Sequence, residues 1–442
     1  MRIKILFFLF LLLREISLNS SFENSEYFPL LDNNISFSMN LDNEDSNFYS
    51  TKEFDHLIDS FMHRYKITGA SVAISNKERL IYAKGFGIAD KETGEYVQPG
   101  HIFRIASISK LITAVGILKL FENGKLALGS KVFGQEGILN DDKFLNYKDP
   151  KFEKITISNL LNHTAGLSTS QDIPIFNSLS ITKEMNLNNP VYIDDLIEYS
   201  LNRKLRSIPG KRYSYSNLGY AILGKVIERI SGMPYEDYIT MEILKPLGIK
   251  DMHLGKNFYQ EKFSNEVMYF EPPGTPKCLS FDGSGEMVPL PYGGNNIELL
   301  GAAGGWVASS SELLRFITAI DGFDHQNDIL SKNTIEMMTN SNSAGNGLFG
   351  WMGADNSGTW WRTGTFTGTT ALVVRQENGI NWIILMNTSN NKRKGLHSLL
   401  YHTMNKATAR NNEWPDIDLF FEKNHNAFWP NDLIAASNKK IN

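Results

Sequence analysis

The hydrophobic positions in the early part of the chain alternate between helical and extended spacing. Apolar residues recur at intervals of three and four over residues 54–61, which predicts a helix. Two mostly apolar runs, 69–74 and 80–88, are separated by a short polar turn and predict a β-hairpin. The segment 107–123 is apolar on almost every side, so we expect a buried helix there that ends at Gly124.

The last third of the chain returns to extended spacing. Helical spacing predicts one helix over residues 311–320 and a final one over 393–406. Four runs between them have the pattern of strands, namely 348–354, 359–366, 370–375 and 381–386. Because strands lie at both ends and the stretch 140–300 favours helices, the pattern predicts an α+β fold with an antiparallel sheet flanked by helices.

This pattern also divides the chain. We expect one domain over residues 51–406, made of a sheet lobe (51–105 and 300–406) and a mostly helical insert (106–299). Residues 21–50 are polar without a clear period and are predicted to be a linker, and residues 407–442 are predicted to be a C-terminal tail.

Residues 1–20 have the pattern of a secretory signal peptide. A short cationic start is followed by nine unbroken apolar residues, Ile5–Leu13. A helix needs about 20 residues to cross a bilayer, so the run favours a signal peptide over an uncleaved membrane anchor. We therefore expect a periplasmic or secreted protein without a membrane span beyond this signal.

Composition narrows the possible functions. With 42% hydrophobic residues among 442, the chain has enough apolar material for a core, which excludes global disorder. A net charge of -4 without a block of like charge argues against nucleic acid and favours a small-molecule or peptide substrate. The single cysteine excludes an internal disulfide, and the histidines form no metal-binding motif, so we expect no metal and no cofactor. The oligomeric state stays open.

The first candidate for chemistry is Ser107-Ile-Ser-Lys110, at the start of the predicted buried helix. A Ser and a Lys three positions apart share a helix face, and a desolvated Lys has a lowered pKa and can accept the Ser proton. The same pattern also begins at Ser180, Ser389 and Ser437, but only Lys110 would be buried. The alternative is a lysine whose charged end reaches solvent.

The second candidate is Tyr215-Ser-Asn217, in a turn before a helix that ends at Gly232. A tyrosine in a rigid turn can transfer protons when neighbouring cations lower its pKa, and Lys110 is one such cation. Asn217 can donate to a substrate carbonyl. The alternative is a core aromatic followed by a helix cap.

The third candidate lies on the predicted strand 359–366. Arg362 offers a bidentate grip for a substrate carboxylate. Gly364 would let a substrate backbone approach closely, and the Thr365 amide could pair with the Ser107 amide as an oxyanion hole. The alternative for Arg362 is a surface ion pair on an edge strand.

In this order, the three motifs resemble the signature of the serine β-lactamase and penicillin-binding-protein superfamily, and Tyr-x-Asn is similar to its class C β-lactamase-like branch. The resemblance covers residues 53–405 and implies a β-lactamase/transpeptidase-like fold. It also implies an acyl-enzyme on Ser107, with proton transfer by Lys110 and Tyr215. The third motif usually begins with Lys or His, so Arg362 preserves the charge and puts a proton relay at this position in doubt.

We therefore expect an exported serine hydrolase that cleaves an amide or ester. The sequence does not separate a β-lactamase, a D,D-peptidase and an esterase. The alternative from another class is a catalytically silent binding or assembly protein that retains the fold.

Overall fold

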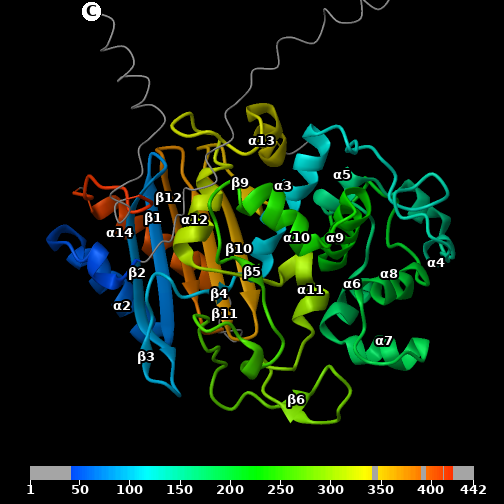
Figure 1. Cartoon of the computed structure of the whole chain (residues 1–442), viewed down its shortest axis with the longest axis horizontal. Helices are drawn as coiled ribbons and strands as arrows, with labels where there is room; N and C mark the ends of the chain where they lie inside the picture. Colours follow the sequence, from blue (N-terminus) through cyan, green and yellow to red (C-terminus); the bar gives the residue numbers. More distant parts are fainter. Residues whose placement is uncertain (1–40, 341–346, 390–394, 412, 422–442) are drawn as a thin grey trace, which may run out of the picture. The chain divides into compact units, whose positions relative to one another are not determined.

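The largest sheet has seven antiparallel strands in the order β3-β2-β1-β12-β11-β10-β9 (Figure 1). The strands are β1 (Gly69–Asn76), β2 (Arg79–Asp90), β3 (Glu95–Tyr96), β9 (Gly353–Ala354), β10 (Trp360–Phe366), β11 (Thr369–Arg375) and β12 (Ile380–Met386). Strand β1 pairs with β12, and Ala70 lies opposite Met386. This pairing confirms the predicted antiparallel sheet built from both ends of the chain.

A computed structural model describes residues 41–340, 347–389, 395–411 and 413–421. The expected signal peptide and most of the expected linker lie outside these residues. Within the described parts, none of the helices has the length and apolar character needed to span a membrane.

One face of the sheet is covered by α2 (Lys52–Tyr65) and α14 (Leu396–Arg410). Alternate residues of β1, including Val72 and Ile74, point to this face and pack against the apolar side of α2. Phe54 and Ile58 of α2 are 1% exposed because helical spacing places both on that side. The predicted helix over 54–61 is thus part of α2.

The opposite face carries α12 (Ser310–Thr318) and the larger apolar core. Ser71 of β1 and Ser310 of α12 share a hydrogen bond of 2.8 Å on this side. Three further helices pack together beside β10: α3 (Ser109–Glu122), α9 (Asn217–Ser231) and α11 (Ile297–Gly304). Figure 1 shows them with the shorter helices of the insert, which agrees with the predicted mostly helical segment.

The other elements are short. The helices are α4 (Asp142–Leu145), α5 (Ile157–Leu161), α6 (Thr169–Asp172), α7 (Ser178–Met185), α8 (Ile193–Leu201), α10 (Tyr235–Ile239) and α13 (Lys332–Thr339). The 3-10 turns are η1 (Asn43–Ser46), η2 (Tyr49–Thr51), η3 (Ala106–Ile108), η4 (Pro150–Lys154), η5 (Ile173–Phe176) and η7 (Tyr259–Glu261), and η6 (Thr240–Leu244) is a π-helix. Strands β4 (Phe103–Arg104), β8 (Trp306–Ala308) and β5 (His253–Leu254) form one small sheet, and β6 (Cys278–Leu279) and β7 (Met287–Val288) form another.

The strand predicted over residues 348–354 is wrong except for its last two residues, which form β9. Gly350 has a φ of 76°, and its N–H donates to the Tyr220 hydroxyl at 2.9 Å. The N–H of Phe349 donates to the carbonyl of Met338. The backbone of this segment therefore bonds to helices instead of extending along β10.

Both predicted ends of the domain need correction. Residues 43–51 form η1 and η2, and the Ser46 hydroxyl accepts a 2.9 Å hydrogen bond from the Ala83 amide of β2. At the other end α14 continues past residue 406, and the Leu419 amide donates to the Leu80 carbonyl at 2.8 Å. Leu419 is 6% exposed, so part of the expected tail packs on the sheet.

Candidate active site

Ser107 lies on the tight turn η3, directly before α3. The preceding Ala106 has a φ of 48°, a left-handed conformation that non-glycine residues rarely adopt. Strand β10 packs closely against this turn. A Cβ atom added to Gly364 would lie only 2.3 Å from the Ile105 carbonyl oxygen, so the strand can approach this closely only with glycine at this position. The close approach that Gly364 permits in this structure is therefore to the backbone that carries Ser107.

Tyr215 lies next to Ser107 although 108 residues separate them in the chain. Its hydroxyl donates to Ser107 Oγ at 2.9 Å, and its side chain is 37% exposed. The following residue, Ser216, caps α9 by accepting a hydrogen bond from the Gly219 amide. Tyr215 is thus held at the helix start and is not the core aromatic of the alternative interpretation, and the cap is Ser216 instead of Asn217.

Lys110 is fully buried at 0% exposure, so its charged end does not reach solvent. Its Nζ donates to Asn217 Oδ1 at 2.8 Å and to the Ala303 carbonyl at 2.5 Å. Ala303 lies in the last turn of α11, which ends at Gly304. Its carbonyl is available because the last four carbonyls of a helix have no hydrogen-bond partner within the helix.

Arg362 is 2% exposed and faces the helical side of the sheet, as does Gly364 two positions later. Its Nε donates to the Ser107 carbonyl at 2.8 Å, and an Nη donates to the Tyr215 hydroxyl at 3.0 Å. The guanidinium therefore connects the Ser107 turn to Tyr215. This contact excludes the alternative of a surface ion pair.

The two cations change the acidity of Tyr215. Burial alone would raise the pKa of its phenol, but the charges of Lys110 and Arg362 and hydrogen bonds lower it to about 8. Burial lowers the pKa of Lys110, whereas the adjacent Tyr215 oxygen raises it. The arrangement therefore makes the phenolate of Tyr215 accessible at about pH 8, beside Lys110.

His163 supports the tyrosine from behind. Its ring centroid lies 4.6 Å from that of Tyr215, and its Nδ1 accepts a hydrogen bond from the Ser216 amide at 3.2 Å. Burial lowers the pKa of His163 well below its ordinary value, and Arg362 and Lys110 lower it further. The imidazole is therefore neutral and acts as a packing partner and acceptor.

The structure thus brings five of the predicted site residues together. Hydrogen bonds connect Ser107, Tyr215 and Arg362, and another connects Lys110 to Asn217. Lys110 Nζ lies 5.0 Å from the centre of the Tyr215 ring. Gly364 packs directly beneath the serine turn. Thr365 follows it with an exposed side chain, and its Oγ1 lies 3.4 Å from His397 Nε2.

Sequence reasoning missed two parts of the site. The carboxylate of Asp172 accepts hydrogen bonds from Asn217 and from the start of α9. The Ala303 carbonyl binds Lys110. The glycine-rich run around Ala303 is visible in the sequence as a signal of irregular backbone, but Asp172 is 45 residues away from its partner and has no local signal.

Comparisons with known proteins agree with this geometry. The family model described as Beta-lactamase matches residues 54–401. The chain is 29% identical over 234 residues to Protein flp of Staphylococcus aureus strain MW2, covering 52% of this chain and 43% of that protein. It is 27% identical over 247 residues to Esterase EstB of Burkholderia gladioli, covering 54% of this chain and 59% of that protein. The aligned part therefore spans about half the length of these curated relatives.

Two solved structures are similar over most of their length. The octameric penicillin-binding protein homologue from Pyrococcus abyssi has a TM-score of 0.58 and 27% identity, covering 79% of this chain and 76% of that chain. The D-amino acid amidase from Ochrobactrum anthropi SV3 has a TM-score of 0.63 and 22% identity, covering 82% and 99%. With the family model matched across most of the chain, the chain belongs to the Beta-lactamase family.

Proposed function

We propose that this protein is a serine hydrolase that cleaves an ester or amide through an acyl-enzyme on Ser107. The observation that carries the proposal is the 2.9 Å hydrogen bond between Tyr215 and Ser107 Oγ, at a tyrosine whose pKa is lowered to about 8. A phenol of this acidity can work as a base near neutral pH. A buried lysine and a buried arginine beside it stabilise the ionised form.

Acylation begins when the Tyr215 phenolate takes the proton from Ser107 Oγ. The Oγ then attacks the substrate carbonyl carbon, and the carbonyl electrons move to its oxygen. We assign the stabilisation of this oxyanion to the amides of Ser107 and Thr365, where removal of one donor typically costs about 10²–10³ in rate. Asn217 holds Lys110 and can use its amide group to align the substrate.

The proton on Tyr215 then passes to the departing amine or alcohol, and the bond from the carbonyl carbon to that group breaks. For deacylation Tyr215 removes a proton from water, and the resulting hydroxide attacks the ester of Ser107. The proton returns to Oγ as the acid product leaves. Lys110 remains charged throughout and keeps the pKa of Tyr215 low.

The relatives support the reaction class and leave the substrate open. One is named an esterase and another a D-amino acid amidase, which fits cleavage of esters or amides by the same arrangement. We assign the protein to the class C-like branch of the family on the Tyr-x-Asn motif. We also propose that Arg362 anchors a carboxylate of the substrate. Export rests on the sequence pattern of residues 1–20.

The proposal is tested by intact-mass analysis after treatment with a fluorophosphonate. Wild type should gain one adduct, and Ser107→Ala should gain none. Ser180→Ala is the matched control, because Ser180 also begins a Ser-x-x-Lys pattern but lies in α7 and bonds only locally to the Asn177 carbonyl. This control variant should be labelled as fast as wild type.

The same experiment distinguishes a serine hydrolase from a catalytically silent binding protein. A correctly folded wild type that gains no adduct, and hydrolyses neither an aryl ester, a D-Ala-D-Ala peptide nor a β-lactam, would favour a silent binding protein. Equal labelling of wild type and Ser107→Ala would show that Ser107 is not the nucleophile.

A further inference from the structure

The carboxylate of Asp172, at the end of α6, lies against the first residues of α9. One oxygen accepts hydrogen bonds from the Ser216 hydroxyl at 2.7 Å and the Leu218 amide at 2.9 Å. The other accepts from both the backbone amide and the side-chain Nδ2 of Asn217, each at 3.0 Å. Four donors thus converge on a single carboxylate.

These contacts determine which way the Asn217 amide points. An ionised carboxylate only accepts hydrogen bonds, so the NH₂ end of the Asn217 side chain must face Asp172. The Oδ1 end then faces Lys110, whose ammonium only donates, at 2.8 Å. A continuous path of carboxylate, amide and ammonium connects Asp172 to the centre of the site.

We propose that Asp172 is a positioning residue for the reaction: it fixes the Asn217 amide so that Lys110 stays charged and directed at Tyr215. The inference rests on the proposed function. Without Asp172 the Asn217 side chain can rotate and present its NH₂ end to Lys110, which removes one of the two oxygen acceptors of the lysine. Lys110 would then lose its fixed place beside Tyr215.

The charges around Lys110 give the proposal an electrostatic consequence. Burial lowers the pKa of Lys110, the Tyr215 oxygen raises it, Arg362 from β10 lowers it and Asp172 raises it. His163, which also packs against Tyr215, is neutral and adds no charge. Neutralising Asp172 should therefore make Lys110 lose its proton at lower pH, and Tyr215 then loses part of the cationic charge that lowers its own pKa.

The simpler interpretation is that Asp172 only caps α9, since carboxylates stabilise helix N-termini. A cap affects the stability of the fold and the amount of folded enzyme. It does not affect the pH at which the folded enzyme gains activity. The two interpretations therefore predict different pH profiles.

The experiment is the pH profile of kcat/KM of Asp172→Asn with p-nitrophenyl butyrate, corrected for the folded fraction. We expect kcat to fall about 10- to 100-fold with a KM within about twofold, because the base is misplaced while substrate contacts remain. We expect the acidic limb of the profile to move up by roughly 0.5–1 pH unit, because the pKa of Tyr215 rises when Lys110 is displaced or uncharged. Asp172→Ser is the second variant, because a neutral serine can still cap the helix if the Asn variant unfolds.

Asp149→Asn is the matched control. Asp149 is a buried carboxylate of the insert that caps a helical turn, accepting hydrogen bonds from the amides of Lys151 and Leu205. Its loss should lower stability and leave the acidic limb in place. A folded Asp172 variant with a wild-type profile would overturn the proposal and leave Asp172 as a helix cap. Failure of the proposed function is recognised separately, since wild type itself would then show no Ser107 adduct.

Discussion

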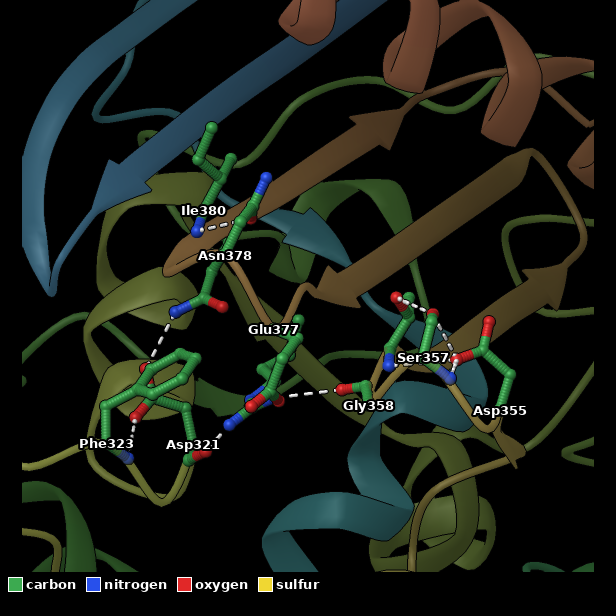
Figure 2. Close-up of polar contacts among 11 residues, drawn as sticks. Asp321, Phe323, Asp355, Ser357, Gly358, Glu377, Asn378 and Ile380 are labelled. Carbon is green, nitrogen blue, oxygen red and sulfur yellow. Dashed lines mark hydrogen bonds and ion pairs between the residues drawn. The ribbon is translucent and has the colours of Figure 1, made fainter.

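Glu78, in the turn between β1 and β2, is fully buried at 0% exposure. Among the described residues, neither of its carboxylate oxygens makes a close hydrogen bond, and the backbone of Gln326 is the smallest of the influences on its pKa. The carboxyl group that faces it belongs to Asp321, which accepts hydrogen bonds from the Phe323 amide at 3.0 Å and from Asn381 Nδ2 at 2.7 Å. Figure 2 shows Asp321 and Phe323 on the turn after α12.

Two facing carboxyl groups can share a hydrogen bond only if one of them carries a proton. Burial raises the pKa of Glu78, and the charge of Asp321 raises it further. The same causes raise the pKa of the neighbouring Asp328 to about 7. The folded protein therefore holds protons that the unfolded chain would release.

We predict that Glu78→Gln makes the protein more stable at alkaline pH. The folded pKa of Glu78 lies above its unfolded value, so its stability contribution is complete below that unfolded value and is lost as the pH rises towards the folded one. Each pH unit in this window costs about 1.4 kcal/mol, so the interval from near pH 5 to near pH 8 removes at most roughly 4 kcal/mol. Local relaxation and water entry reduce this, and we expect a loss of about 2–3 kcal/mol from the free energy of unfolding.

The measurement is urea unfolding of wild type and Glu78→Gln across this pH range. A glutamine amide can donate to the Asp321 carboxylate at every pH, so the variant should match wild type near pH 5 and exceed it by about 2–3 kcal/mol near pH 8. A variant that is equally or less stable than wild type near pH 8 would show that ionised Glu78 is well solvated or paired, and would refute the reasoning.

Glu122→Gln is the control with the opposite sign. Burial alone would raise the pKa of Glu122, but hydrogen bonds from Thr334 and Ser331 lower it, and the Ser331 amide donates at 2.7 Å. Its stabilising effect is present above the unfolded pKa and is lost as the pH falls. Glu122→Gln should therefore cost stability near pH 8 and little in acid.

Two further predictions concern the site. Gly364→Ala should lower kcat/KM at least about 100-fold, because a Cβ 2.3 Å from the Ile105 carbonyl oxygen displaces the Ser107 turn. Gly129→Ala is its control and should leave the rate unchanged, because a Cβ at this position meets no neighbour within 4 Å. Arg362→Lys retains the charge but cannot bond both the Ser107 carbonyl and Tyr215 in the same way, so we expect a loss of about tenfold or more on neutral esters and a larger loss on carboxylate-bearing esters, which also lose the bidentate grip. Equal losses on the two kinds of ester would count against Arg362 as the anchor of a substrate carboxylate.

The periodic parts of the fold could be predicted from the sequence because burial on one face imposes a period. This holds for α2, for the hairpin of β1 and β2, and for the strands from β10 to β12. The strand predicted directly before β9 was wrong, because the backbone there bonds to Tyr220 and Met338, which are distant in the sequence. The predicted ends of the domain were wrong for a related reason. Isolated side chains such as Ser46 bond to β2, and single contacts of this kind leave no periodic pattern of apolar residues in the sequence.

The sequence predicts which kinds of residue form the site and the order in which they occur along the chain. It does not predict which of them contact one another. The sequence places Lys110 on a buried helix, yet its partners Asn217 and Ala303 come from two other helices. The left-handed backbone at Ala106 has no sequence signal, because alanine has no preference for it. The site therefore depends on the packing of α3, α9, α11 and β10, which local patterns do not encode.

The charges of the site explain why Tyr215 is more acidic than a tyrosine in water. Lys110 and Arg362 donate their described hydrogen bonds to neutral oxygens of Asn217, Ala303, Ser107 and Tyr215. Asp172 supplies one negative charge through Asn217, which leaves one positive charge uncompensated while Tyr215 is neutral. Ionisation of Tyr215 balances the charges of these four groups, and a buried group of charges is most stable when it is balanced. In the mechanism that we propose, the same imbalance reappears when Tyr215 takes up the serine proton, just as negative charge develops on the substrate oxygen, so the site would be electrostatically matched to the oxyanion as well as to its base.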